Sequence, residues 1–491
     1  MNLRIRLVSS LLGSGARGAL TFCTSLLLAR ALGATDFGRL AFLTSLFMAL
    51  RTLLDMGSSS AFFTFLSQTP RSRAFLGYFC KYHLVCFFLV LAALGFLLPD
   101  QFVHGLWRGE PRWLLCLAFA AVFMQSQVAT TAAQMAEAAR QTKAGQVIQT
   151  LTTLVHLSAV LILWKCGWLG VATIFIAMII EFGLSGWLLA RLYPFAAPVS
   201  GSPAGEGAKI FREFRAYCAP FLGYILVGFL YETGDRWMLQ RWSGSEQQAY
   251  YALASQFSTV VLLAAGASVR VFWKEVSEAV YRGDIPRAVH LYGKFSRPLF
   301  FLGACLAGTL VPWADVILGL ALGREFLAGT IPLAIMFLYP VHQGLNQIAG
   351  TFLLAAGHTG TYTRVGNLFM VGSLIAAYGV LAPTEALVPG LGWGAAGLAA
   401  KMVLMQILQV GTIQVALNKN FGISLDWGWQ TLVLAMVLGV GFAIKIFLLK
   451  AVPSQPAVQL GLGILLASLC WLGLLRPLLS GFSWSNLLSA R

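Results

Sequence analysis

Charged residues are scarce in this chain. Only 11% of its 491 residues are Asp, Glu, Lys or Arg, whereas 58% are hydrophobic. Because soluble globular proteins carry about 25% charged residues, this scarcity excludes a soluble domain as the main body of the protein. The apolar runs are about 20 residues long, which is the length of a membrane-spanning helix and too long for a barrel strand. The sequence therefore predicts an all-α polytopic membrane protein.

Catalytic and metal-binding motifs are also lacking. The chain contains no phosphate-binding GxxxxGK[ST] sequence, no GxSxG and no HExxH. Its eight cysteines form no CxxC pair and mostly fall within apolar runs, which is typical of small core residues. No large outer loop is expected either, and this argues against a membrane glycosyltransferase or polymerase. We therefore expect a protein that is not an enzyme and has no cofactor and no metal site.

Acidic residues are few, 18 against 34 Lys and Arg. When the N-terminus is placed in the cytoplasm and about fourteen spans alternate across the membrane, most Lys and Arg fall on inner loops. This asymmetry follows the positive-inside rule, so the net charge of +16 requires no nucleic-acid partner. An even number of spans also returns the C-terminus to the cytoplasm.

The order of features predicts an internal repeat. The polar hairpin Leu32 to Phe42 joins the first two spans, and a similar one, Trp242 to Leu253, joins the seventh and eighth. Both contain Gly, a short polar run, and aromatic and small residues that open the next helix. Two six-helix halves that both start inside form the parallel repeat known from transporters. We predict an N-terminal bundle over residues 1–192, a Pro/Gly/Ser-rich cytoplasmic linker over 193–213, a second bundle over 214–417, and two additional helices with a tail over 418–491.

Three ionisable residues lie inside the first two spans: Arg17, Arg51 and Asp55. Charges in lipid are costly, so we expect these side chains to face one another or a watery cavity. Arg17 lies roughly 14 Å from the cytoplasmic start of its span, and Arg51 roughly 22 Å from the cytoplasmic end of the next. Two guanidinium groups with one carboxylate leave a positive site that suits phosphate. Arg51 and Asp55 are four residues apart, so a self-contained ion pair remains the alternative.

Other charges in the spans are weaker candidates. Arg270, near the inner end of the eighth span, either lines the cavity or extends to the lipid headgroups. A carrier coupled to an ion gradient needs a group that changes charge state or binds the ion. The candidates for this role are Asp55, Glu181, Glu232, Asp235 and Lys401. Glu181 needs a partner, Glu232 and Asp235 could instead form an interfacial ion pair with Arg236, and His156 is expected to be a hydrogen-bonded core residue.

Two motifs carry a resemblance to a known family. The run Leu28 to Phe42, followed by Leu54-Asp-Met-Gly57, resembles the opening of Wzx-type oligosaccharide flippases, polysaccharide biosynthesis exporters of the MOP superfamily. The segment Glu232 to Leu239 and the residues Ala249 to Ala252 resemble the matching motif of the second half. The resemblance covers residues 1–300 by motif and the remainder by hydropathy only.

The resemblance implies a MATE-like pseudo-twofold pair of six-helix bundles around a central cavity, working by alternating access. It implies a flippase in the bacterial inner membrane that moves an undecaprenyl-diphosphate-linked oligosaccharide to the periplasmic leaflet. Related lipid II flippases bind diphosphate with arginines on the first, second and eighth helices, where Arg17, Arg51 and Arg270 fall here. The expected partners are the lipid-linked oligosaccharide, membrane lipids, H⁺ or Na⁺, and the polymerase and glycosyltransferases of the pathway. A MATE-like drug antiporter is the alternative, although arginines outnumber acids in the proposed cavity.

Overall fold

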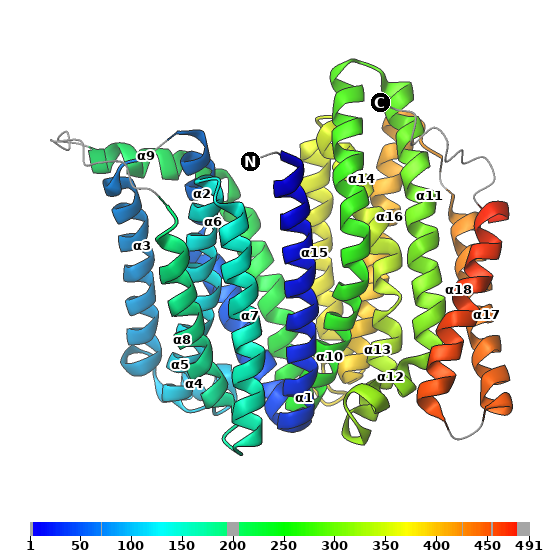
Figure 1. Ribbon diagram of the computed structural model, residues 1–491, viewed down its shortest axis with the longest axis horizontal. Coiled ribbons are helices and arrows are strands. Elements are labelled where there is room, and N and C mark those ends of the chain that lie inside the picture. Colours follow the sequence, from blue (N-terminus) through cyan, green and yellow to red (C-terminus); the bar gives the residue numbers. More distant parts are fainter. Residues whose placement is uncertain (1–2, 70, 194–205, 425, 453–454, 479–491) are drawn as a thin grey trace. The chain divides into compact units, whose positions relative to one another are not determined.

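A computed structural model describes residues 3–69, 71–193, 206–424, 426–452 and 455–478. These residues form helices and turns, with no strand among them (Figure 1). Helices are the expected outcome, because a helix satisfies every interior backbone hydrogen bond within its own segment in lipid. The fold class expected from composition is confirmed.

The elements of the first half of the chain are α1 (Leu3–Asp55), α2 (Ser58–Gln68), α3 (Arg73–Ala92), α4 (Asp100–Trp107), α5 (Arg112–Phe123), a π-helical segment η2 (Met124–Ala129), α6 (Thr130–Ala138), α7 (Thr142–Lys165), α8 (Val171–Ala190), α9 (Glu206–Cys218) and α10 (Leu222–Tyr281). Those of the second half are α11 (Ile285–Leu310), α12 (Ala314–Ala321), α13 (Thr330–Met336), α14 (Tyr339–Ala355), α15 (Thr359–Leu381), α16 (Gly394–Phe421), α17 (Trp427–Ala451) and α18 (Pro456–Leu478). Short π and 3-10 segments join several of them.

Twelve helical stretches in the described residues are long and apolar enough to cross a membrane. Two of them, α1 and α10, are broken by a glycine with a left-handed φ, Gly33 (φ 76°, ψ 172°) and Gly244 (φ 85°, ψ −179°). When the two limbs of α1 and the two limbs of α10 are counted separately, these twelve stretches become fourteen. This agrees with the about fourteen spans expected from the sequence. The two glycines have nearly the same backbone conformation at matching places of the predicted repeat.

The chain divides into two compact units, Met1–Ala249 and Tyr250–Arg491. In the first unit, α1 runs from one end to the other and returns, so that α2 lies at the end where α1 began (Figure 1). In this unit α1 packs against α5 and α7, and α8 packs against α5, α6 and α7. In the second unit, α11 packs against α14 and α17, and α16 packs against α13, α14 and α15.

The predicted linker is not irregular throughout the described residues. Part of the stretch 193–213 is helical, because α9 begins at Glu206 and continues to Cys218, whereas residues 194–205 lie outside the described residues. The Pro/Gly/Ser-rich composition ends before α9. From there Ile210, Phe214 and Tyr217 recur at helical spacing and pack against α2 and α3.

Candidate functional site

The junction between α1 and α2 is a break in the helix at two consecutive left-handed residues, Met56 (φ 49°) and Gly57 (φ 81°). A helix that starts after such a break has backbone N–H groups without partners in its first turn. The side chain of Asp55 satisfies one of them, because its Oδ1 accepts a hydrogen bond from the Ser59 amide at 3.1 Å. The same oxygen accepts hydrogen bonds from the hydroxyls of Ser58 at 3.1 Å and Ser59 at 2.5 Å. The carboxylate of Asp55 therefore organises the start of α2.

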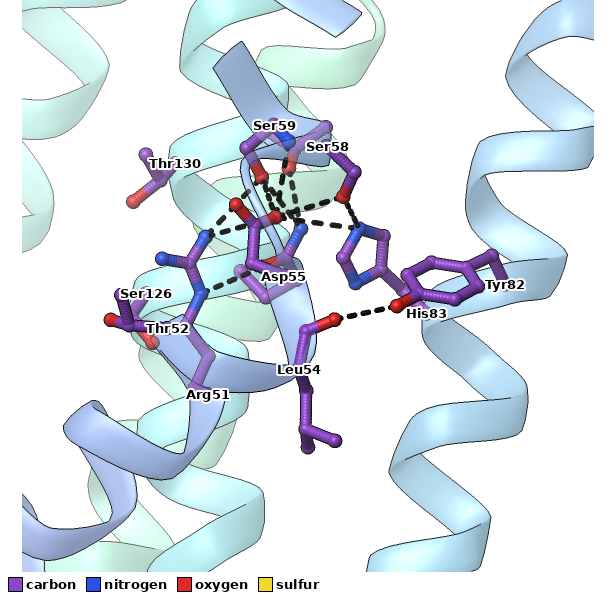
Figure 2. Close-up of polar contacts among 12 residues, drawn as sticks. Arg51, Thr52, Leu54, Asp55, Ser58, Ser59, Tyr82, His83, Ser126 and Thr130 are labelled. Carbon is purple, nitrogen blue, oxygen red and sulfur yellow. Dashed lines mark hydrogen bonds and ion pairs between the residues drawn. The ribbon is translucent and has the colours of Figure 1, made fainter. Parts of the chain in front are cut away.

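Arg51 lies one turn before Asp55 and points to the same group of side chains (Figure 2). Its Nε donates to Oε1 of Gln127 at 2.7 Å, and its Nη2 donates to Oγ of Ser59 at 3.3 Å. The distance from Nη2 to Oδ1 of Asp55 is 3.9 Å, so the predicted pair exists but is long. Gln127 belongs to η2, the π-helical segment between α5 and α6, and its Nε2 donates to Ser59 at 3.1 Å.

A histidine on α3 completes this group. Nε2 of His83 lies 3.0 Å from the Ser58 hydroxyl and 3.6 Å from Oδ1 of Asp55. The neighbouring Tyr82 donates its hydroxyl hydrogen to the carbonyl of Leu54 at 2.6 Å (Figure 2). Two side chains of α3 thus contact the end of α1. We call Arg51, Asp55, Ser58, Ser59, His83 and Gln127 the junction cluster.

The junction cluster is largely shielded and holds a cation and an anion in unequal environments. The side chains of Arg51 and Asp55 are 16% and 9% exposed. Asp55 accepts three hydrogen bonds, whereas Nη1 of Arg51 has no hydrogen-bond partner among the described residues. Because guanidinium groups bind planar anions through paired N–H groups, this free edge is suited to a phosphate oxygen.

Arg17 lies elsewhere on α1. Its Nη1 donates to Oε1 of Gln146 on α7, and its Nη2 donates to Ser14 at 3.2 Å. No hydrogen bond or ion pair in the described part of the chain joins Arg17 to Arg51 or Asp55. A common ligand for the two arginines therefore stays a prediction. Arg270 belongs to α10, but its side chain lies outside the described residues.

The acidic candidates occupy different places. Glu181 on α8 is buried, and its Oε2 lies 2.7 Å from Nδ1 of His156 on α7. The sequence predicts a partner for Glu181 and a hydrogen-bonded core position for His156. In the structure these two residues contact each other. On α10, Asp235 is buried and Glu232 is exposed. Lys401 on α16 is 2% exposed, and its Nζ donates to Ser373 on α15 at 2.9 Å.

Replacing Glu181 tests whether the contact with His156 stabilises the first unit. The variant Glu181→Leu leaves the imidazole without its partner and is expected to lower the free energy of unfolding by about 1–3 kcal/mol. The variant Glu181→Gln keeps a hydrogen-bonding group and is the matched control. Thermal unfolding of the purified proteins gives the comparison. Equal melting temperatures for the two variants would contradict a stabilising contact.

Comparisons with known proteins agree with this architecture. A model of the family described as polysaccharide biosynthesis protein matches residues 7–272, which include the whole junction cluster. The chain belongs to this family. Comparison with curated proteins gives no match.

Solved structures with a similar fold are transporters. A lipid II flippase, MurJ, in an inward closed conformation aligns over 94% of this chain and 98% of its own, with a TM-score of 0.68 and 14% identity. The MATE multidrug transporter DinF-BH, in complex with R6G, aligns over 85% and 95%, with a TM-score of 0.56 and 14% identity. A MOP superfamily transporter from Pyrococcus furiosus aligns over 85% and 96%, with a TM-score of 0.54 and 13% identity.

At such low identity these likenesses show the fold alone. This member of the polysaccharide biosynthesis family is a multi-pass membrane protein with the fold of MOP superfamily transporters. The family resemblance and the fold expected from the opening motifs are thereby confirmed.

Four residues of the junction cluster are absent from the sequence-based candidates: Ser58, Ser59, His83 and Gln127. His83 is the one histidine in a largely apolar span, and an ionisable side chain in such a span is the signal that could have identified it. Gln127 has no such signal, because its position depends on the π-helical turn of η2.

Proposed function

We propose that this protein is a flippase that moves an undecaprenyl-diphosphate-linked oligosaccharide from the cytoplasmic to the periplasmic leaflet of the bacterial inner membrane. Membership of the polysaccharide biosynthesis family supports a glycan cargo. The observation that carries the proposal is Arg51, a shielded guanidinium in a membrane-spanning helix with one edge free for an anion. Both termini would lie in the cytoplasm, as the distribution of Lys and Arg predicts.

In this mechanism Arg51 binds a phosphate oxygen of the cargo, and Arg17 adds a second positive charge on the same helix. Arg270 of α10 would supply a third. The two bundles, residues 1–192 and 214–417, would open alternately to the two sides of the membrane. The oligosaccharide would cross with the diphosphate because the two are covalently joined.

A coupling ion, H⁺ or Na⁺, would drive the cycle. The candidate residues are Asp55, Glu181, Glu232, Asp235 and Lys401. We place Asp55 first because it lies in the junction cluster, where a change in its charge would alter the position of Arg51. Its neighbour His83 lies close enough to share a proton with it through Ser58.

The variants Arg51→Ala and Arg17→Ala test the proposal. Loss of a charged hydrogen bond to phosphate costs about 1.5–3 kcal/mol, so transport should fall by about one to two orders of magnitude. The measurement is surface glycan in a strain that depends on this protein, at matched membrane levels. Arg51→Lys keeps the charge without the paired N–H groups and should retain part of the activity.

The matched control is Arg282→Gln, because this arginine is an exposed member of an ion pair with Glu278 on α10. It should leave surface glycan unchanged. Unaltered glycan in both Arg51→Ala and Arg17→Ala would refute the diphosphate site. Resistance to cationic drugs on overexpression, with no effect on glycan, would favour the antiporter instead.

A further inference from the structure

A cavity of about 180 Å³ lies beside the junction cluster, where the α1–α2 junction, α3, α9 and the start of α10 meet. All of these elements belong to the first unit. The walls are mainly aromatic and aliphatic side chains, among them Tyr78, Phe79, Phe211, Phe214 and Leu222. An engineered apolar cavity of about 150 Å³ holds benzene, so this one has room for a short run of hydrocarbon chain.

Two polar groups of the cavity, those next to the junction cluster, are already bonded. Asp55 and Ser58 line one wall, but they are hydrogen-bonded to each other and within the junction cluster. A buried water needs about two to four polar partners, and apart from Arg215 the remaining wall is mainly aromatic and aliphatic. Phe211, which lines the cavity, is 51% exposed, so the cavity can be reached from outside the helix bundle. These features suit a hydrocarbon chain that enters from the surrounding bilayer.

The helix that covers the cavity, α9, has two different faces. Ile210 and Phe214 are buried against α2 and α3, and Phe214 stacks on Phe75 with ring centroids 5.3 Å apart. An ion pair of 3.1 Å between Glu213 and Arg71 holds the helix against the α2–α3 turn. Figure 1 shows α9 lying across the end of the first unit rather than running along α3. This is the arrangement of an amphipathic helix at a membrane surface.

The outer face of α9 is cationic. Lys209, Arg212 and Arg215 follow one another at intervals of three residues, and all three are exposed. None of them makes an ion pair with another residue in the part of the chain that the structure describes. Arg215 also lines the cavity, so this residue belongs both to the cationic face of α9 and to the apolar cavity. An occupant that uses both must have a negative head and an apolar tail.

We propose that this cavity and the outer face of α9 form a binding site for an anionic glycerophospholipid of the surrounding bilayer. One hydrocarbon chain fills the cavity, and the phosphate contacts Lys209, Arg212 and Arg215 through charge-assisted hydrogen bonds. The bilayer supplies this lipid in excess, so a weak site is filled by mass action. The hydrocarbon chain of the lipid packs against the part of the wall formed by Asp55 and Met56. A bound lipid therefore stabilises the α1–α2 junction.

The test uses the purified full-length protein and native mass spectrometry. Phosphatidylglycerol, phosphatidylethanolamine with the same acyl chains, and undecaprenyl phosphate are added in separate experiments. Phosphatidylglycerol should be retained at least tenfold more strongly than phosphatidylethanolamine and should raise the melting temperature. The triple variant Lys209→Gln/Arg212→Gln/Arg215→Gln should remove this preference, whereas the control Arg282→Gln should keep it. The variant Ala219→Trp, which fills the cavity, should reduce retention of phosphatidylglycerol at least tenfold.

A second measurement does not depend on the folding of any variant. Phosphatidylglycerol with a diazirine in its acyl chain should label peptides that contain residues 211–222 in the wild-type protein. Equal retention of the two phospholipids, or labelling that avoids this segment, would overturn the proposal. Stronger retention of undecaprenyl phosphate than of phosphatidylglycerol would overturn the assignment to bulk lipid in favour of the carrier lipid. Binding is measured without transport, so the result does not depend on whether the Arg51 variants export glycan.

Discussion

The substitution Gly38→Ala is expected to lower transport by about two orders of magnitude while leaving the fold intact. Gly38 lies on α1 after the break at Gly33, and Ser245 lies after the matching break at Gly244 on α10. A Cβ atom on Gly38 would be 1.8 Å from the backbone oxygen of Ser245 and 2.6 Å from its carbonyl carbon. Because backbone atoms cannot rotate away as side chains do, the two turns would have to separate.

Separation of these turns has a functional cost if both take part in the transport cycle. In an alternating-access carrier a contact at one end of the molecule forms in one state and breaks in the other. Overpacking of this kind costs about 1–3 kcal/mol, and a backbone clash lies at the upper end of that range. The state that contains the contact would then lose about two orders of magnitude in population. Surface glycan should fall accordingly.

The rest of this turn should tolerate the change. Arg39 binds Glu110 through two hydrogen bonds of 2.7 and 2.8 Å and Asp36 through one of 2.8 Å, so the turn after Gly33 stays anchored to the α4–α5 connection. The control is Gly77→Ala, because a Cβ atom on Gly77 of α3 meets nothing within 4 Å. Glycan levels are compared at equal membrane content. If Gly38→Ala and Gly77→Ala gave the same glycan, the contact with Ser245 would not be needed for transport.

The sequence predicts the fold class and the membrane-spanning segments because hydrophobic length alone determines them. It also predicts the hairpins, since Gly33 and Gly244 have the same polar and aromatic surroundings and adopt the same conformation. It does not predict α9 correctly. The stretch 193–213 contains a Pro/Gly/Ser-rich segment and the start of an amphipathic helix. When the composition of the whole stretch is considered together, the helical pattern of its second part is hidden.

The junction cluster could be predicted only in part. The spacing of four residues places Arg51 and Asp55 on one helix face, and the structure has them 3.9 Å apart. The left-handed conformation of Met56 could not be foreseen, because residues other than glycine rarely adopt it. That break directs Ser58 and Ser59 toward Asp55, and it allows His83 to reach them. Contacts between helices distant in the sequence, such as His156 with Glu181, depend on packing that periodicity does not specify.

Replacing Asp55 by leucine is the second change with a large expected effect. The substitution removes the group that accepts three hydrogen bonds from Ser58 and Ser59. It also removes the only carboxylate that lies within 4 Å of Arg51 among the described residues. Removing one member of a buried ion pair costs about 3–5 kcal/mol. We expect about 3 kcal/mol, since the pair is 3.9 Å long and Arg51 keeps its contact with Gln127. The measurement is the thermal or denaturant unfolding of the purified protein, followed by tryptophan fluorescence.

The double variant Arg51→Leu/Asp55→Leu separates a structural ion pair from a ligand-binding arginine. With both charges gone, no unpaired charge remains buried, so the double variant should be more stable than Asp55→Leu alone. If the pair only holds the helices together, a stable double variant also exports glycan at the normal level. If Arg51 binds the diphosphate, the double variant folds but exports no more glycan than Arg51→Ala. We expect the second result, because Arg51 has a free guanidinium edge whereas the hydrogen bonds of Asp55 are directed to α2. Normal export by a stable double variant would show that the junction cluster has a structural role only.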